Sequence, residues 1–223
     1  MPDFAELRRT MIDRQVRTVD VTDPAVLAAL QAVPREAFAP QELRGVAYSD
    51  ADIPIAAGGP HSPPRYLVEP AILARLLQLA DVGPDDVVLD VGCGTGYSSA
   101  VLAQLASSVV SLESDPNLAG KATETLLELD IVNAAVVTGP LQEGYRPEGP
   151  YDVIMMAGSV EAIPPVLYKQ LKEGGRLVAV RGIGPAGMAI VALKDAGEIS
   201  ERSAFNAPAP PLPGFTRAPS FQF

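Results

Sequence analysis

Apolar and polar residues follow one pattern in the first third of the chain and another in the rest. Residues 4–17 carry apolar side chains near helical period, which predicts an amphipathic helix. A second helix is expected after residue 22, because Thr22 or Asp23 can cap it and Pro24 suits its first turn. Residues 52–64 are rich in glycine and proline and predict an extended loop.

From residue 86 onward, short apolar runs alternate with helical patterns. This alternation is typical of a mainly parallel twisted sheet with helices on both faces, so the chain is expected to be an α/β protein with a Rossmann-like fold. Ligands of such sheets bind at the carboxyl ends of the strands. Strands are expected at 87–91, 109–112, 135–138, 153–156, 176–180 and 188–193, and helices at 70–79, 97–105, 116–129 and 164–172.

These patterns divide the chain into three parts. Residues 1–68 form an N-terminal helical and loop segment that packs on the core, and residues 69–195 form the cofactor-binding core. Residues 196–223 form a proline-rich extension, in which four prolines between residues 206 and 214 exclude a helix interior or a central strand. Core packing is the expected role of the tail phenylalanines, which are Phe205, Phe215, Phe221 and Phe223.

Composition excludes several classes of protein. With 27 acidic against 17 basic residues, the chain has a net charge of −10 and lacks the basic stripe of a nucleic-acid binder. No apolar run reaches membrane-spanning length. One histidine, His61, and one cysteine, Cys93, argue against a metal site and exclude an intrachain disulfide. The polar N-terminus and the lone cysteine predict a cytoplasmic location.

The segment after the first core strand carries the strongest chemical signal. Gly92, Gly94 and Gly96 lead from that strand directly into a helix, and glycines are needed where backbone turns tightly or approaches a ligand closely. Glu113 ends the next strand, where a carboxylate can accept hydrogen bonds from both ribose hydroxyls. Asp90 could hold an amino group of the ligand. Alternatively, Asp90 only orders the loop and Glu113 is an exposed charge at a strand end.

At these residues the sequence resembles the protein-L-isoaspartate O-methyltransferases. The similarity extends over about residues 25–182, and Gly96-Tyr97 is more particular to that family than the glycines are. The matching segments are 89–103, 33–40, Tyr48 with 52–55, 151–156 and 164–178. The resemblance implies methyl transfer from S-adenosylmethionine to the carboxylate of isoaspartyl residues in damaged proteins or peptides, as a step of protein repair.

The resemblance also implies which residues hold the cofactor. They are Asp90, Gly92, Cys93, Gly94, Gly96, Tyr97, Glu113, Ser114, Gly139, Pro140 and Leu141. Two positions depart from the family pattern. Val68 stands where the family carries an active-site serine, and Pro140 stands where an aspartate contacts the adenine amino group.

The candidate catalytic residues are Val68 (at the serine position), Tyr66 and Arg65. Arg65 could pair with a substrate carboxylate, or it could be an ordinary solvated arginine beside a packed Tyr66. A carboxylate nucleophile is already ionised at pH 7, so methyl transfer to it requires no strong base. Two alternatives stay open: a cofactor-binding protein without catalysis, and a methyltransferase with a different acceptor. The expected partner is an isoaspartyl protein or peptide, with no nucleic acid or membrane, and the sequence leaves the oligomeric state open.

Overall fold

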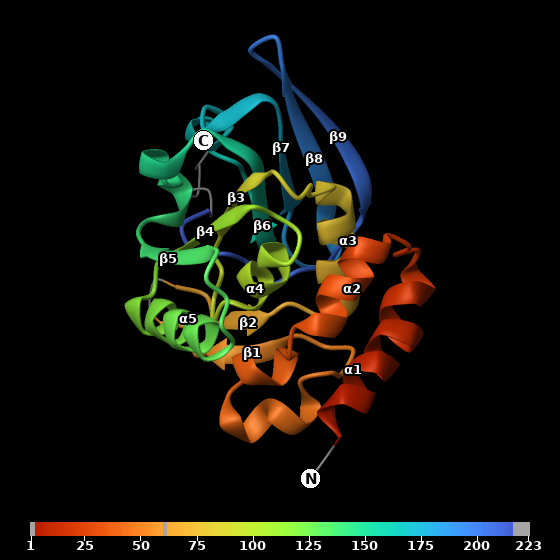
Figure 1. The fold of residues 1–223 in the computed structure, drawn as a ribbon. Helices are drawn as coiled ribbons and strands as arrows, with labels where there is room; N and C mark the ends of the chain where they lie inside the picture. The colour runs from red at the N-terminus through yellow and green to blue at the C-terminus, as the bar shows by residue number, and fades with distance from the viewer. Residues whose placement is uncertain (1–2, 60–61, 216–223) are drawn as a thin grey trace, which may run out of the picture.

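A seven-stranded sheet in the order β5-β4-β3-β6-β7-β8-β9 forms the centre of the computed structural model, which describes residues 3–59 and 62–215 (Figure 1). Strands β3 to β7 run parallel, and β8 and β9 continue the sheet antiparallel. The expected mainly parallel, Rossmann-like fold is therefore confirmed. The strands are β3 (Val87–Val91), β4 (Ser108–Glu113), β5 (Ala134–Thr138), β6 (Tyr151–Val160), β7 (Leu171–Arg181), β8 (Met188–Asp195) and β9 (Glu198–Asn206).

The inner strands read as unbroken apolar runs because both faces of the sheet are covered. In β3, Val88 packs into one buried cluster with the helices α2 to α5, while Leu89 packs into a second cluster with α6. Leu212 and Phe215 of the tail complete that second cluster. The helices are α1 (Phe4–Met11), α2 (Pro24–Ala32), α3 (Pro70–Ala80), α4 (Tyr97–Ala103), α5 (Pro116–Glu128) and α6 (Pro165–Tyr168).

The N-terminal segment follows its predicted local signals. Asp23 caps α2, since its carboxylate accepts a hydrogen bond of 2.7 Å from the amide of Ala25. Helix α1 passes into a π-helical turn at Ile12–Val16, and two 3₁₀ segments follow α2, η3 (Arg35–Phe38) and η4 (Gln41–Val46). His61, Phe221 and Phe223 lie outside the described residues.

The prediction of an extended loop over 52–64 is wrong at its start. Strand β1 (Ile53–Ala56) pairs antiparallel with β2 (Arg65–Leu67). Ile53 and Ile55 are buried while Pro54 is exposed, a position where an edge strand tolerates a residue without an amide hydrogen. In the view of Figure 1, the two strands lie below the main sheet, next to α5.

The prediction of a helix over 164–172 is also wrong in length. Helix α6 ends at Tyr168, because the backbone carbonyl of Gln170 already accepts the amide of Tyr151 at 2.8 Å. That hydrogen bond draws the chain into strand β7 at Leu171. The expected C-terminal extension begins with β9, a strand of the main sheet.

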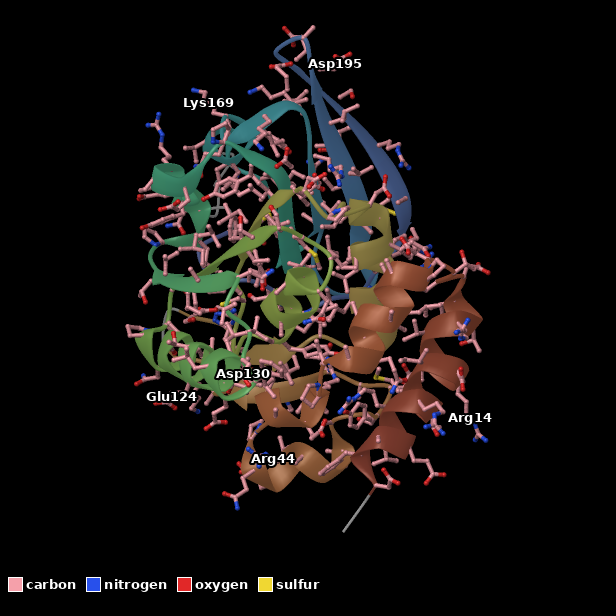
Figure 2. The ribbon with its side chains drawn as sticks, viewed as in Figure 1. Arg14, Arg44, Glu124, Asp130, Lys169 and Asp195 are labelled. Atoms are coloured by element: carbon pink, nitrogen blue, oxygen red, sulfur yellow. The ribbon has the colours of Figure 1, made fainter. Side chains whose placement is uncertain are left out.

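Most charged side chains project outward, as the labelled residues in Figure 2 illustrate, with Asp195 at the tip of the β8–β9 hairpin. Among the described residues, four charged side chains are instead buried: Arg35, Arg65, Asp90 and Glu113. No helix in that part of the chain is both long and apolar enough to cross a membrane. Three of the four buried charges gather at the carboxyl ends of β3 and β4, since Asp90 lies in β3, Glu113 ends β4 and Arg65 is bonded to Glu113.

Candidate functional site

The glycine loop leaves the carboxyl end of β3 with a backbone that other residues rarely adopt. Gly92, Gly94 and Gly96 have φ values of 82°, 60° and 97°. The amides of Gly92 and Cys93 donate to the carbonyl of Leu112 at 2.8 and 3.2 Å, which holds the loop against the end of β4. The loop therefore presents its backbone beside the residue that follows Leu112, Glu113.

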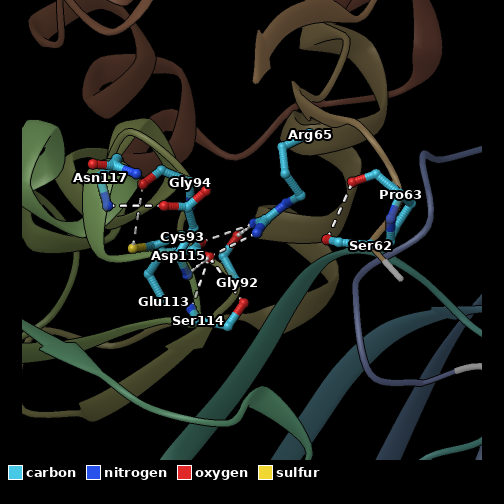
Figure 3. Close-up of polar contacts among 10 residues, drawn as sticks. All are labelled: Ser62, Pro63, Arg65, Gly92, Cys93, Gly94, Glu113, Ser114, Asp115 and Asn117. Carbon is cyan, nitrogen blue, oxygen red and sulfur yellow. Dashed lines mark hydrogen bonds and ion pairs between the residues drawn. The ribbon is translucent and has the colours of Figure 1, made fainter. Parts of the chain in front are cut away.

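The carboxylate of Glu113 is fully buried and accepts backbone hydrogen bonds from the glycine loop and from the two residues that follow β4. Its Oε2 accepts the amide of Gly94 at 2.8 Å, and its Oε1 accepts the amides of Ser114 and Asp115 at 2.8 and 3.0 Å. The predicted alternative, that Glu113 is an exposed strand-end charge, is wrong. Figure 3 shows these contacts converging on Glu113.

Arg65 completes the shell around this carboxylate. From β2, its Nη1 donates to Oε1 of Glu113 at 2.7 Å and its Nη2 donates to Oε2 at 2.8 Å (Figure 3). Nη2 also donates to the carbonyl of Gly92 at 3.1 Å. Arg65 is 6% exposed, so the expectation of an ordinary solvated arginine is wrong. A bidentate pair of this kind is the strongest geometry available to a guanidinium and a carboxylate.

Asp90, the second buried acid, is bound to the helix that follows the loop. Its Oδ2 accepts the hydroxyls of Ser98 and Ser99 at 2.6 and 2.7 Å, while Oδ1 accepts no hydrogen bond from the described residues. Burial raises the pKa of Asp90 to about 6, against the opposing effect of the two serines. Burial also raises the pKa of the Cys93 thiol, so Cys93 fits a packing role and not that of a nucleophile.

The residues expected near an adenine ring lie at the end of β5, beside the same acid. The amide of Gly139 donates to the carbonyl of Glu113 at 3.0 Å. Leu141 is fully buried, and its Cδ1 would lie 3.4 Å from a Cβ added at Gly92. Pro140 lies between them, directly before the 3₁₀ turn Leu141–Glu143, so this corner offers apolar surface against the loop.

The candidate catalytic residues Tyr66 and Val68 lie next to the glycine loop. With Gly92, Cys93 and other neighbours they line a cavity of only about 20 Å³. Val68 is 6% exposed and packs in the core. Its carbonyl accepts Nη2 of Arg35 at 2.8 Å.

Arg35 is a site neighbour that the sequence did not single out. It is fully buried, its Nε donates to the carbonyl of Ala47 at 2.7 Å, and its guanidinium lies 4.8 Å from the ring centroid of Tyr97. The available signal was a lone arginine in the otherwise largely apolar segment 33–40. Through Val68 and Tyr97, Arg35 holds the segment before α3 against the start of α4.

Leu212 is the other residue that the sequence did not single out. A Cβ added at Gly92 would lie 2.8 Å from Leu212 Cδ2, and one added at Gly158 would lie 2.7 Å from Leu212 Cγ. The leucine thus rests on two glycines at the carboxyl ends of β3 and β6. Its only local signal was a leucine among prolines, which does not indicate where the tail docks.

Known proteins match this chain over most of its length. A family model described as protein-L-isoaspartate(D-aspartate) O-methyltransferase matches residues 6–204. The chain is 39% identical over 196 residues to a protein-L-isoaspartate O-methyltransferase of Koribacter versatilis, covering 88% of this chain and 86% of that protein. It is 40% identical over 188 residues to one of Rhodopseudomonas palustris, covering 84% of each chain.

Solved structures share the fold at lower identity. A protein-L-isoaspartate O-methyltransferase superposes with a TM-score of 0.81 at 23% identity, over 93% of this chain and 66% of that one. A Plasmodium falciparum protein assigned to the same enzyme class, in complex with S-adenosyl-L-homocysteine, superposes with a TM-score of 0.77 at 21% identity. That match covers 95% of this chain and 99% of the other.

Proposed function

Since this chain belongs to the protein-L-isoaspartate O-methyltransferase family, we propose that it transfers a methyl group from S-adenosylmethionine to the isoaspartyl carboxylate of a damaged protein or peptide. The proposal rests on the family match over residues 6–204 and on relatives that are 39–40% identical over most of their length. Protein repair is the role that this reaction would serve.

One observation of the site supports this function above all. A loop with three glycines at positive φ leaves one parallel strand, and the carboxylate of Glu113 ends the neighbouring strand beside it. In open α/β sheets, ligands bind outside the carboxyl ends of the strands, and an acid at this place binds ribose hydroxyls. Glu113 and the loop are thus the expected anchors for the donor's nucleoside, with Asp90, Ser114, Gly139 and Leu141 around them.

The side chains as arranged do not fit S-adenosylmethionine. Sites for ligands of this size enclose about 300–1,000 Å³, whereas the space between the loop, Tyr66 and Val68 is about 20 Å³. Arg65 occupies both oxygens of Glu113, and Leu212 lies on Gly92. A larger cavity of about 280 Å³ between η3, η4 and α5 meets the loop at Thr95 and does not include Glu113. The described conformation is therefore a closed one.

The acceptor side lacks the hydroxyl that the family places there. Val68 presents a buried isopropyl group at that position. An isoaspartyl carboxylate is ionised near neutral pH, so it needs positioning and not deprotonation. Loss of one positioning hydrogen bond typically costs about 1–3 kcal/mol when its partner is left unpaired. On this basis we expect a slow enzyme.

A second candidate is a family member that no longer catalyses methyl transfer and acts as a partner protein. Val68 and Pro140 favour this candidate, because neither can supply the polar contact expected at its position. The closed arrangement of Arg65 and Leu212 favours it as well. We keep it as the alternative that the activity assay must exclude.

Location, partners and organisation belong to the same proposal. The lone, buried Cys93 and the acidic composition are compatible with a cytoplasmic protein that acts on polypeptides and not on nucleic acids. We also propose residues 1–68 as the packing segment, 69–195 as the cofactor core and 196–223 as the extension. Strand β8, at the end of the core, pairs with β9, at the start of the extension, so both segments share one sheet.

The decisive assay is transfer of labelled methyl from S-adenosylmethionine to an isoaspartyl peptide, with the normal aspartyl peptide of the same sequence as control. We expect slow labelling of the isoaspartyl peptide alone. Labelling of neither peptide, at protein concentrations where a 39% identical relative is active, would favour the non-catalytic candidate. Equal labelling of both peptides would remove the proposed acceptor.

A further inference from the structure

We infer that this chain closes its own donor site, with Arg65 bound to Glu113 in place of a ribose and Leu212 covering the glycine loop. The inference rests on the proposed function, because it concerns the regulation of the same site. Two segments far apart in the sequence provide the closure, strand β2 and residues 207–215. Both reach the same point of the loop, Gly92.

Arg65 presents to Glu113 the hydrogen-bond pattern that a ribose diol would present. Two parallel N–H groups donate to the two carboxylate oxygens at 2.7 and 2.8 Å. Three backbone amides and the Ser114 hydroxyl also donate to these oxygens, so with Arg65 in place six donors share the about four acceptor sites of a carboxylate that is 0% exposed, and none is left for a diol. A diol and the guanidinium therefore cannot bind Glu113 together. The ion pair is charge-assisted and buried, so a neutral diol is the weaker of the two competitors.

Leu212 fills the space above the loop that a bound donor would need. Its side chain packs against the two glycines Gly92 and Gly158, where a Cβ would collide with it at 2.8 and 2.7 Å. The backbone fixes it there: the amide of Leu212 donates to the carbonyl of Ser159 at 2.9 Å, and the amide of Ser159 donates to the carbonyl of Pro210 at 2.8 Å. Residues 210–212 thus lie alongside Ser159, near the carboxyl end of β6, in a short parallel pairing.

Residues 207–215 are packed against the core of the protein. Ala207, Ala209, Leu212 and Phe215 are each at most 5% exposed. A donor can then bind only to the fraction of molecules in which β2 and residues 207–215 have moved. Its apparent dissociation constant is the intrinsic one divided by that fraction. Weakening either contact should therefore tighten the binding of S-adenosylmethionine.

The first measurement is the affinity for S-adenosylmethionine, by titration calorimetry, of the native chain and of the Leu212→Ala and Arg65→Met variants. We expect both variants to bind at least about tenfold more tightly than the native chain. The matched controls are Leu167→Ala, a fully buried leucine of the same core cluster, and Arg176→Met, an arginine paired with Asp86. Both controls should remain within about twofold of the native affinity, which separates opening of the site from general loosening.

The second measurement uses the native chain and remains informative if Arg65→Met does not fold. Amide hydrogen exchange is followed at Leu212 and Ser159 with and without millimolar S-adenosylmethionine. Because both amides are bonded in the closed form, we expect the donor to speed their exchange. Unchanged or slower exchange at both, together with equal affinities of the native chain and Leu212→Ala, overturns the closure.

The outcomes separate this inference from the proposed function. Tight binding by the native chain with no change in the variants overturns the closure and leaves the methyltransferase proposal standing. Tighter binding by the variants without labelling of the isoaspartyl peptide supports the closure and removes the proposed reaction. Absence of binding in every folded variant overturns both, because the closure would then not be what excludes the donor.

Discussion

Replacing Arg65 with methionine removes two charged donors from a carboxylate that has no contact with water. Glu113 is 0% exposed and would keep its three backbone hydrogen bonds, from Gly94, Ser114 and Asp115, and the 3.2 Å hydrogen bond from the Ser114 hydroxyl. Breaking a buried ion pair by removing one partner costs about 3–5 kcal/mol, because the other charge stays behind. The four remaining donors place the expected loss of unfolding free energy near the lower limit, at about 3 kcal/mol.

Urea unfolding at pH 7, together with thermal melting, measures this loss. A chain of this length loses about 2–4 °C of Tm per kcal/mol, so Arg65→Met should melt about 6–12 °C lower. A double-mutant cycle with Glu113→Gln isolates the pair itself. The double variant should be less destabilised than the sum of the two single variants, with a coupling energy of about 2 kcal/mol.

The control is Arg17→Met, which breaks the solvent-exposed pair between Arg17 and Asp13, whose side chains are 55% and 57% exposed. Its expected cost is at most about 0.5 kcal/mol. If Arg65→Met also cost less than about 1 kcal/mol and showed no coupling to Glu113, Arg65 would be behaving as a surface residue. The argument for a buried pair at the donor site would then be refuted.

Three further predictions test the loop and its surroundings. Burial raises the pKa of Asp90 to about 6, so the native state holds this proton more tightly than the unfolded state does. Relative to Asp90→Asn, native stability should therefore fall by about 2 kcal/mol as pH rises from 4 to 7, and parallel stability curves would contradict this. Gly96→Ala should lower the free energy of unfolding by about 1–3 kcal/mol, because φ is 97° and the added Cβ would lie 3.1 Å from Ala122 Cβ. Its control, Gly120→Ala on the exposed face of α5, should raise the free energy of unfolding by about 0.5–1 kcal/mol, and similar values for both in urea unfolding would refute the steric argument. Val68→Ser should lower the free energy of unfolding by about 1–3 kcal/mol, since the hydroxyl enters an apolar core, and should increase methyl transfer to the isoaspartyl peptide. Unchanged transfer would show that the missing hydroxyl does not limit the reaction.

Local patterns were sufficient to predict most of the fold. The alternation of apolar runs and helical periods predicted each parallel strand and α5, although β7 begins five residues earlier than expected, and Asp23 was one of the two candidate caps of α2. The errors occurred where pairing with another segment overrode a local preference. Helix α6 stops early because the carbonyl of Gln170 binds the amide of Tyr151, and β1 forms because β2 lies beside it. The first contact joins residues 19 apart, and the second is a pairing across residues 57–64 that the glycine- and proline-rich composition did not reveal.

The sequence by itself determined the glycine loop and the acid that faces it. A tight turn with positive φ requires glycine, and parallel topology brings the ends of neighbouring strands to one edge, so the meeting of Gly92 with Glu113 follows from local rules. Only the tertiary structure decided what occupies that meeting point. The pairing of Arg65 with Glu113 and the packing of Leu212 on Gly92 depend on where β2 and the tail dock, which is set by shape and burial across the whole molecule.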